Sequence, residues 1–138
     1  ATIWPHGDEK DKLDEFANIG DAFFKRIAAA PRQPTERGLD DGRAIHAPVG
    51  SYDPNAYGLF DVSGNVEEWC RDTFGPYRNP VAPGNGLRRP QDGTTEKVSR
   101  GGSFLVVAPY VRSASRSNRD PKIRLANLGV RPSREIDR

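Results

Sequence analysis

Glycine and proline interrupt this chain so often that long helices and strands have little room to form. The 138 residues include 14 glycines and 12 prolines. Glycine weakens the interior of helices and strands, and proline removes a backbone donor from both. Hydrophobic residues make up 35% of the chain, and they include 2 Trp, 6 Phe and 4 Tyr. We therefore expect a single loop-rich α+β domain whose core depends on a few large side chains.

Three segments nevertheless predict regular structure. Asp21 precedes AFFKRIAAA and is a suitable N-cap, so a helix is expected over 22–30, ended by Pro31. The segment 97–107, KVSRGGSFLVV, predicts a strand with a glycine pair where backbones approach closely. A last strand is expected near 128–132. No internal repeat or linker divides the chain.

The cysteine and histidine content excludes several kinds of site. Cys70 is the single cysteine, which rules out an internal disulfide and a multi-thiolate metal site. His6 and His46 lie forty residues apart, so zinc or non-haem iron bound by this chain alone is not expected. Cys70 has acidic neighbours and no nearby histidine, and acidic neighbours raise the pKa of a thiol. We expect it to be a packed side chain rather than a nucleophile.

The charge of the chain is unevenly distributed. The net charge is +2, but residues 99–138 carry 9 basic and 3 acidic side chains. A basic tail raises the question of nucleic-acid binding. The arginines are spread out, with only Tyr110 as a nearby stacking ring, so we expect them to pair with acidic residues earlier in the chain and expect no nucleic-acid partner. No apolar run approaches the ~20 residues of a membrane helix, and no signal peptide is visible.

The stretch 58–72, GLFDVSGNVEEWCRD, concentrates oxygen ligands around a glycine turn. Hard cations such as calcium prefer carboxylates and backbone carbonyls, and a tight turn brings several of these together. The spacing is not that of an EF-hand loop, which needs glycine at its sixth position and glutamate at its twelfth. On spacing alone, both a cation site and a capped surface turn remain open.

Several motifs occur in a fixed order, namely APVGSYDPNAYGLFDVSGNVEEWCRD, VSRGGSF, VRSASRSNRDP and NLGVRPSRE. This set resembles the formylglycine-generating enzyme family, also called the sulfatase-modifying-factor family. The resemblance runs from Trp4 to Arg134 and implies that family's irregular fold, which is related to C-type lectins. Because the family's enzymes normally carry a further N-terminal portion with an LPTEAEWE-type segment, the chain 1–138 is interpreted as the C-terminal portion of such a domain.

The resemblance also implies two structural calcium sites, each built from two side chains and two backbone carbonyls. The implied ligands are Asn18, Ile19, Asp41 and Arg43 for the first site and Asp61, Gly64, Val66 and Glu68 for the second. Calcium would tie together turns that a thin core cannot hold alone. Structural calcium favours a periplasmic or secreted location, although the sequence leaves the compartment open.

The family's catalytic cysteine pair is missing. In its enzymes two cysteines after the GGS strand bind copper and attack a substrate cysteine, and those places fall at Val106 and Val111 here. Valine has no thiolate, so the resemblance implies a non-catalytic relative without copper or catalytic residues. Two alternatives stay open, namely an oxidase or other family enzyme completed by another chain and a ligand-displaying lectin-like variable protein. Glu67 also departs from the family, which usually has Trp there.

The segment after the GGS strand is the expected contact surface. The candidate residues are Phe104, Val106, Tyr110, Arg112, Arg116, Asn118 and Arg119. Apolar groups ringed by arginines suit a protein partner or an anionic ligand. A complementing N-terminal chain is another expected partner. The alternative is that the apolar part of this segment simply faces the core.

Overall fold

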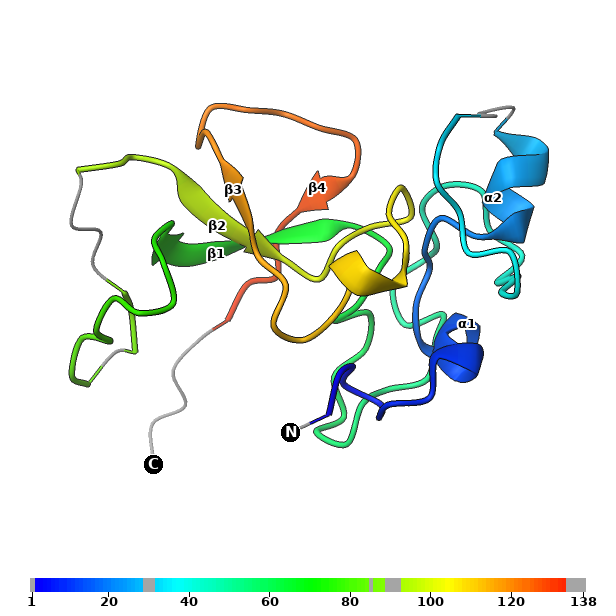
Figure 1. The fold of residues 1–138 in the computed structure, drawn as a ribbon, viewed down its shortest axis with the longest axis horizontal. Coiled ribbons are helices and arrows are strands. Elements are labelled where there is room, and N and C mark those ends of the chain that lie inside the picture. The colour runs from blue at the N-terminus through cyan, green and yellow to red at the C-terminus, as the bar shows by residue number, and fades with distance from the viewer. Residues whose placement is uncertain (1, 29–31, 85, 89–92, 134–138) are drawn as a thin grey trace.

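The structure is a computed structural model that describes residues 2–28, 32–84, 86–88 and 93–133. Short helices occupy one end of the molecule and a small sheet the other (Figure 1). The helical end contains a 3₁₀ turn, η1 (Lys10–Lys12), and two helices, α1 (Leu13–Phe16) and α2 (Ala22–Ile27). As the glycine and proline content predicts, most of the described chain lies in turns and loops.

The sheet has four strands in the order β3-β2-β1-β4. They are β1 (Glu67–Thr73), β2 (Lys97–Arg100), β3 (Ser117–Arg119) and β4 (Leu128–Gly129). β2 pairs with β1 and β3 in antiparallel fashion, while β4 runs parallel to β1. The mixed α+β, loop-rich class is therefore confirmed.

The core joins the helical end to the loop that follows β2. Its buried members are Trp4, Leu13, Ala17, Ile19, Leu39, Ala108 and Val111, with Val106 packed against them. The indole Nε1 of Trp4 donates to the carbonyl of Ala108 at 3.2 Å. Ala108 begins a second 3₁₀ turn, η2 (Ala108–Tyr110). Trp4 and Ala108, which are about a hundred positions apart in the sequence, therefore belong to the same core.

The sequence patterns predicted the positions of α2, β2 and β4 correctly, but they predicted longer elements than the structure contains. Asp21 caps α2 through a 2.8 Å bond from the backbone N–H of Phe24, as predicted, and the helix ends at Ile27. The rest of the predicted helix falls partly on residues 29–31, which lie outside the described part. The strand predicted over 97–107 is wrong beyond Arg100, because the φ angles of Gly101 and Gly102, 88° and 67°, turn the chain out of the sheet. The last strand is only Leu128–Gly129.

None of the helices in the described ranges is both long and apolar enough to cross a lipid bilayer.

Candidate functional site

The turn that precedes β1 is anchored on both sides by backbone hydrogen bonds. The N–H of Gly64 donates to the carbonyl of Gly101 at 2.8 Å, and the N–H of Asn65 donates to the carbonyl of Asn18 at 2.7 Å. Asn65 and Asp61 both have positive φ angles, 59° and 54°, in the left-handed region that non-glycine residues seldom adopt. The Asn65 side chain also exchanges two bonds with the backbone of Ala47. This turn therefore connects the helical end to the sheet.

The first implied calcium site contains an unsatisfied amide oxygen. Asn18 is fully buried, and its Nδ2 donates to the carbonyl of Ile45 at 2.7 Å. Its Oδ1 is buried without a hydrogen-bond partner among the described residues. A buried acceptor left unpaired costs about 1–3 kcal/mol, unless water or an ion occupies the position.

Asp41 supplies the carboxylate of the same implied site. The pKa of Asp41 is raised to about 7, chiefly by burial and also by the nearby Asp21 carboxylate, while bonds from Arg43 and Tyr52 act in the opposite direction. The backbone N–H of Ile19 also lies close enough to lower this pKa, so Asp41 is beside the Asn18–Ile19 segment. An amide oxygen without a donor beside a carboxylate that is hard to ionise fits a divalent cation, which would favour the ionised form.

At the second implied site an arginine already holds one carboxylate. The Oδ2 of Asp61 accepts from the N–H of Gly50 at 2.6 Å, and its Oδ1 is buried with no partner in the ranges that the structure describes. Glu68 is bound at both oxygens by Arg131, at 2.9 Å from Nε and 2.6 Å from Nη2. The same guanidinium donates to the carbonyl of Phe60 at 2.9 Å. A cation here would have to share Glu68 with Arg131, so this donor set fits calcium less well than the first.

The described residues contain no cluster of three or more His, Cys, Asp or Glu side chains that could hold a metal ion. The first implied site combines one carboxylate with one amide side chain and two backbone carbonyls, and the second combines two carboxylates with two backbone carbonyls, so neither site is a cluster of this kind.

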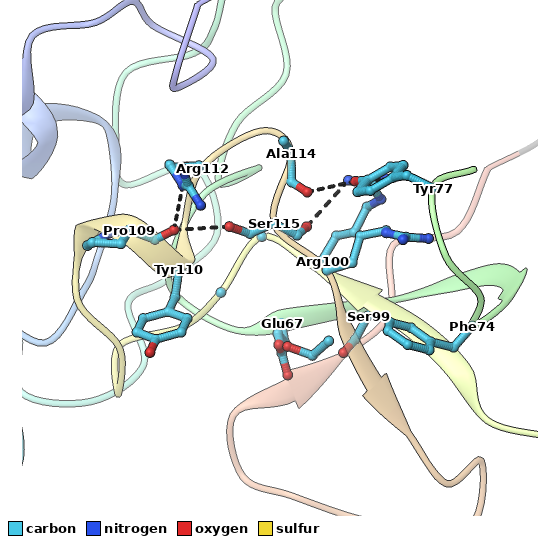
Figure 2. A pocket seen from close by; sticks show the side chains of 14 residues that line it. Glu67, Phe74, Tyr77, Ser99, Arg100, Pro109, Tyr110, Arg112, Ala114 and Ser115 are labelled. Carbon is cyan, nitrogen blue, oxygen red and sulfur yellow. Dashed lines mark hydrogen bonds between the residues drawn. The ribbon is translucent and has the colours of Figure 1, made fainter. Parts of the chain in front are cut away.

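A cavity with a volume of about 460 Å³ lies on the sheet side of the η2 segment. Figure 2 shows Pro109 and Tyr110 on one side, Phe74 and Tyr77 on the other, and Glu67 and Ser99 at the base between them. Arg100, Arg112 and Arg116 also line this cavity, which we call the arginine pocket. Its size is within the range of small-molecule sites, ~300–1,000 Å³.

Two of the three arginines hold the wall of the arginine pocket in place. Arg100 donates to the carbonyls of Ser113 and Ser115 at 3.1 and 3.4 Å, and Arg116 donates to the carbonyl of Gly75 at 2.9 Å. The guanidinium of Arg116 lies 3.6 Å from the ring centre of Tyr77, a cation–π contact. These bonds leave the guanidinium charges uncompensated by any carboxylate within the described part of the chain.

Glu67, at the position where the family usually has Trp, is a buried acid at the base of this pocket. Its side chain is only 7% exposed, and its Oε2 accepts from Arg119 Nη2 at 2.7 Å and Nε at 3.1 Å. Arg119 lies on β3 and reaches across β2 to β1. This ion pair, together with that between Arg131 and Glu68, bears out the expectation that arginines of the basic tail pair with earlier acids.

The expected contact surface divides into two parts. Tyr110, Arg112 and Arg116 line the arginine pocket, whereas Asn118 bonds to Glu96 on the exposed side of β3. The assignment of Phe104 to an exposed surface is wrong, because its side chain is 5% exposed and packs against Phe24 and His46. Val106 is partly buried against the core. Both face inward because the glycine turn ends the strand before them.

The two valines at the family's cysteine positions lie together. A Cβ built on Gly102 would be 2.6 Å from Val111 Cγ1 and 3.1 Å from Val106 Cγ2, so both side chains meet beside Gly102, which lines the arginine pocket. Cys70 lies on β1, half-buried, and burial raises the pKa of its thiol. The one thiol of the chain is therefore neither at this position nor activated.

Sequence reasoning missed the roles of Glu67 and Arg131. Glu67 had been noted only as a departure from the family, and nothing local indicates its partner 52 residues away. Arg131 belongs to the NLGVR motif, but its contact with Glu68 follows from the parallel pairing of β4 with β1.

This arrangement is that of a sulfatase-modifying-factor domain with a C-type-lectin-like fold. Residues 1–136 match the family described as "Sulfatase-modifying factor enzyme 1-like domain", and the chain belongs to that family.

Its relatives include formylglycine-generating enzymes from distant organisms. The enzyme of Streptomyces coelicolor is 38% identical over 116 residues, covering 77% of this chain and 34% of that protein. The enzyme of Mus musculus is 30% identical over 139 residues, covering 94% and 33%. Among solved structures, Treponema denticola variable protein 1 superposes with a TM-score of 0.67 at 26% identity, over 94% of this chain and 40% of that one. The chain thus spans about a third of the length of the curated relatives that it matches.

Proposed function

We propose that this chain is a calcium-stabilised binding module of the sulfatase-modifying-factor family that does not perform the family's thiol-dependent oxidation. In this proposal the arginine pocket receives a protein partner or an anionic ligand, and calcium stabilises the turns that contain Asn18, Asp41 and Asp61. A complementing N-terminal chain would be one such partner, and a periplasmic or secreted location is proposed with the calcium.

The proposal that the chain does not perform the oxidation rests on Val106 and Val111. A methyl group of each lies beside Gly102, and the resemblance places two thiols at these positions. A hydrocarbon side chain cannot bind copper or form a mixed disulfide with a substrate cysteine. Cys70 cannot substitute for them, because it lies on β1 and its raised pKa disfavours the thiolate.

The observation that supports calcium is the unsatisfied Oδ1 of Asn18, which is next in sequence to Ile19, whose backbone N–H acts on the Asp41 carboxylate. The residues that would hold calcium at the first site are Asn18 and Asp41 through their side chains, with carbonyl oxygens from Ile19 and Arg43. Bound calcium would supply structural cross-linking between the helical end and the loop that contains Asp41. At the second site Asp61, Gly64, Val66 and Glu68 would contribute, in competition with Arg131.

The alternative is an oxidase that is completed by another chain. It is supported by the similarity to proteins named formylglycine-generating enzyme, and it can be tested directly. We expect the purified chain, loaded with copper and given a cysteine-containing substrate peptide, to consume no oxygen and to form no aldehyde. Oxygen consumption is followed with an oxygen electrode, and aldehyde formation is followed by mass spectrometry of the peptide. The Streptomyces coelicolor enzyme serves as the positive control in the same buffer. Turnover by this chain, alone or with an added N-terminal portion, would refute the non-oxidative proposal.

Removal of calcium is expected to lower the melting temperature by several degrees, and Asp41→Asn is expected to remove the part of that response that comes from the first site. The direction in which the stability of the metal-free protein changes with pH follows from the raised pKa of Asp41. Because folded Asp41 has a pKa of about 7 and the unfolded carboxyl one near 3.8, the metal-free fold retains the proton longer and loses stability as pH rises from about 4 through 7. Differential scanning fluorimetry with EDTA or added calcium, from pH 5 to 8, measures this.

Asp41→Asn should also flatten the pH dependence of the metal-free protein, since it removes the carboxyl that titrates. Asp53→Asn is the matched control, because Asp53 is an exposed carboxylate outside both implied sites. Equal melting curves of the wild type in EDTA and in calcium would refute the calcium proposal.

A further inference from the structure

We propose that the arginine pocket binds a small organic oxyanion, with the anionic group at Arg112 and an apolar or aromatic body against Tyr110 and Pro109. This inference rests on the proposed function and names the ligand chemistry of its pocket.

The charge of the pocket selects an anion. Of the residues that line it, Arg100, Arg112 and Arg116 are cationic, and Glu67 is the one acid. Glu67 is already neutralised by Arg119, and the five ion pairs of the described residues include none of the three lining arginines. A concave surface with uncompensated guanidinium groups attracts carboxylates, sulfates and phosphates, which they bind by paired N–H donors.

Arg112 is the arginine that is free to make this contact. Arg100 donates Nη1 to backbone carbonyls of the wall and Nη2 to the Tyr77 hydroxyl, and Arg116 donates Nη2 to the carbonyl of Gly75. Among the described residues, Arg112 instead uses only Nε, which donates to the carbonyl of Pro109 at 2.9 Å. That bond fixes the side chain and leaves the two terminal NH₂ groups available, in a position that Figure 2 shows above the base of the pocket. A guanidinium held in place loses less conformational entropy when it binds.

The base of the pocket has unused hydrogen-bonding capacity. Ser99 is fully buried at this base, and its hydroxyl has no partner in the described part of the chain. The Nε of Arg116 is also buried without a partner there. Buried polar atoms without partners are rare in folded proteins, and a polar ligand group that enters the base would relieve this cost.

The walls favour an organic ligand over an inorganic ion. The Tyr110 side chain is 64% exposed beside the exposed Pro109. An inorganic anion would leave this ring in water, and it would leave most of the 460 Å³ unfilled. A ligand with a ring next to its oxyanion contacts Tyr110 and Arg112 at once.

The test uses two probes that differ only in charge, N-acetyl-phenylalanine and its neutral primary amide. By titration calorimetry at low salt, we expect the carboxylate to bind about tenfold more tightly than the amide, since a charge-assisted hydrogen bond is roughly twice as strong as a neutral one. Arg112→Gln should remove the difference between the probes. The matched control Arg124→Gln, which removes an equal charge from an exposed loop residue outside the pocket, should preserve it.

A second variant tests the apolar half without endangering the fold. Because Tyr110 is mostly exposed, Tyr110→Ala should fold normally and should weaken both probes about fivefold while the carboxylate keeps its advantage. Equal binding of the two probes, equal losses in Arg112→Gln and Arg124→Gln, or inorganic sulfate binding as tightly as the aromatic carboxylate would each overturn the proposal. Absence of any binding would also overturn it, whereas the calcium response and the oxygen-uptake assay judge the proposed function separately.

Discussion

Gly64→Ala is expected to destabilise the protein by more than about 3 kcal/mol and to abolish the fixed structure of the turn before β1. A Cβ at Gly64 would overlap the carbonyl oxygen of Asn18 and lie 2.9 Å from the carbonyl carbon of the same residue. The φ angle of Gly64 is +73°, which adds a backbone cost for alanine. Neither Asn18 nor the turn can retreat, because the N–H of Asn65 bonds to that same carbonyl.

Gly58→Ala provides the matched control for this prediction. Gly58 has the same φ angle of +73°, but a Cβ there would meet no atom within 4 Å. Its replacement should therefore cost only the backbone strain, about 1–2 kcal/mol. Urea denaturation of both variants, followed by near-ultraviolet circular dichroism, gives the comparison. Equal losses would show that the close approach to Asn18 does not contribute.

Arg119→Ala is expected to lower stability by about 3 kcal/mol, because it leaves the carboxylate of Glu67 buried without a counter-charge. The side chain of Glu67 is 7% exposed and that of Arg119 31%, so water can replace only part of the lost interaction. Adding Glu67→Gln should recover a substantial part of the loss, since a neutral amide is cheaper to bury than an unpaired charge. Chemical denaturation at pH 7 measures the complete double-mutant cycle.

The control for this ion pair is Arg26→Ala. Arg26 pairs with Asp40 at 3.3 Å, and both side chains are about half exposed, so its loss should cost less than about 1 kcal/mol. If Arg119→Ala costs no more than Arg26→Ala, then the buried pair does not stabilise the sheet. If Glu67→Gln fails to rescue Arg119→Ala, the penalty does not come from the unpaired acid.

Features that depend on neighbouring residues could be predicted from the sequence. Asp21 was correctly assigned as a cap because a cap needs only the N–H groups of the next three residues. The loop-rich class follows from the glycines and prolines in the same local way. The family motifs led to the fold as a whole, which local patterns could not specify.

Features that depend on the assembled sheet could not be predicted. β2 looked long because its apolar residues continue past the glycine pair, yet the positive φ angles of Gly101 and Gly102 turn the chain toward the core and bury Phe104. The acids of the stretch 58–72 were interpreted as cation ligands, but the guanidinium of Arg131 binds Glu68. Such pairings arise only after β4 has been placed beside β1.

The contact between the Trp4 indole and the Ala108 carbonyl also has a consequence for how the chain acquires its structure. Five of the seven buried core residues lie within residues 4–39, but the other two, Ala108 and Val111, lie in and just after η2, on the far side of β1 and β2 in sequence. During synthesis this part of the core therefore stays open on the side that Ala108 and Val111 cover until about a hundred further residues have been made. Closing so long a loop is slow, and apolar side chains that stay exposed during this time promote aggregation. Under the calcium proposal, binding at Asn18 and Asp41, which are only 23 positions apart in the sequence, would organise this end before the distant part of its core arrives.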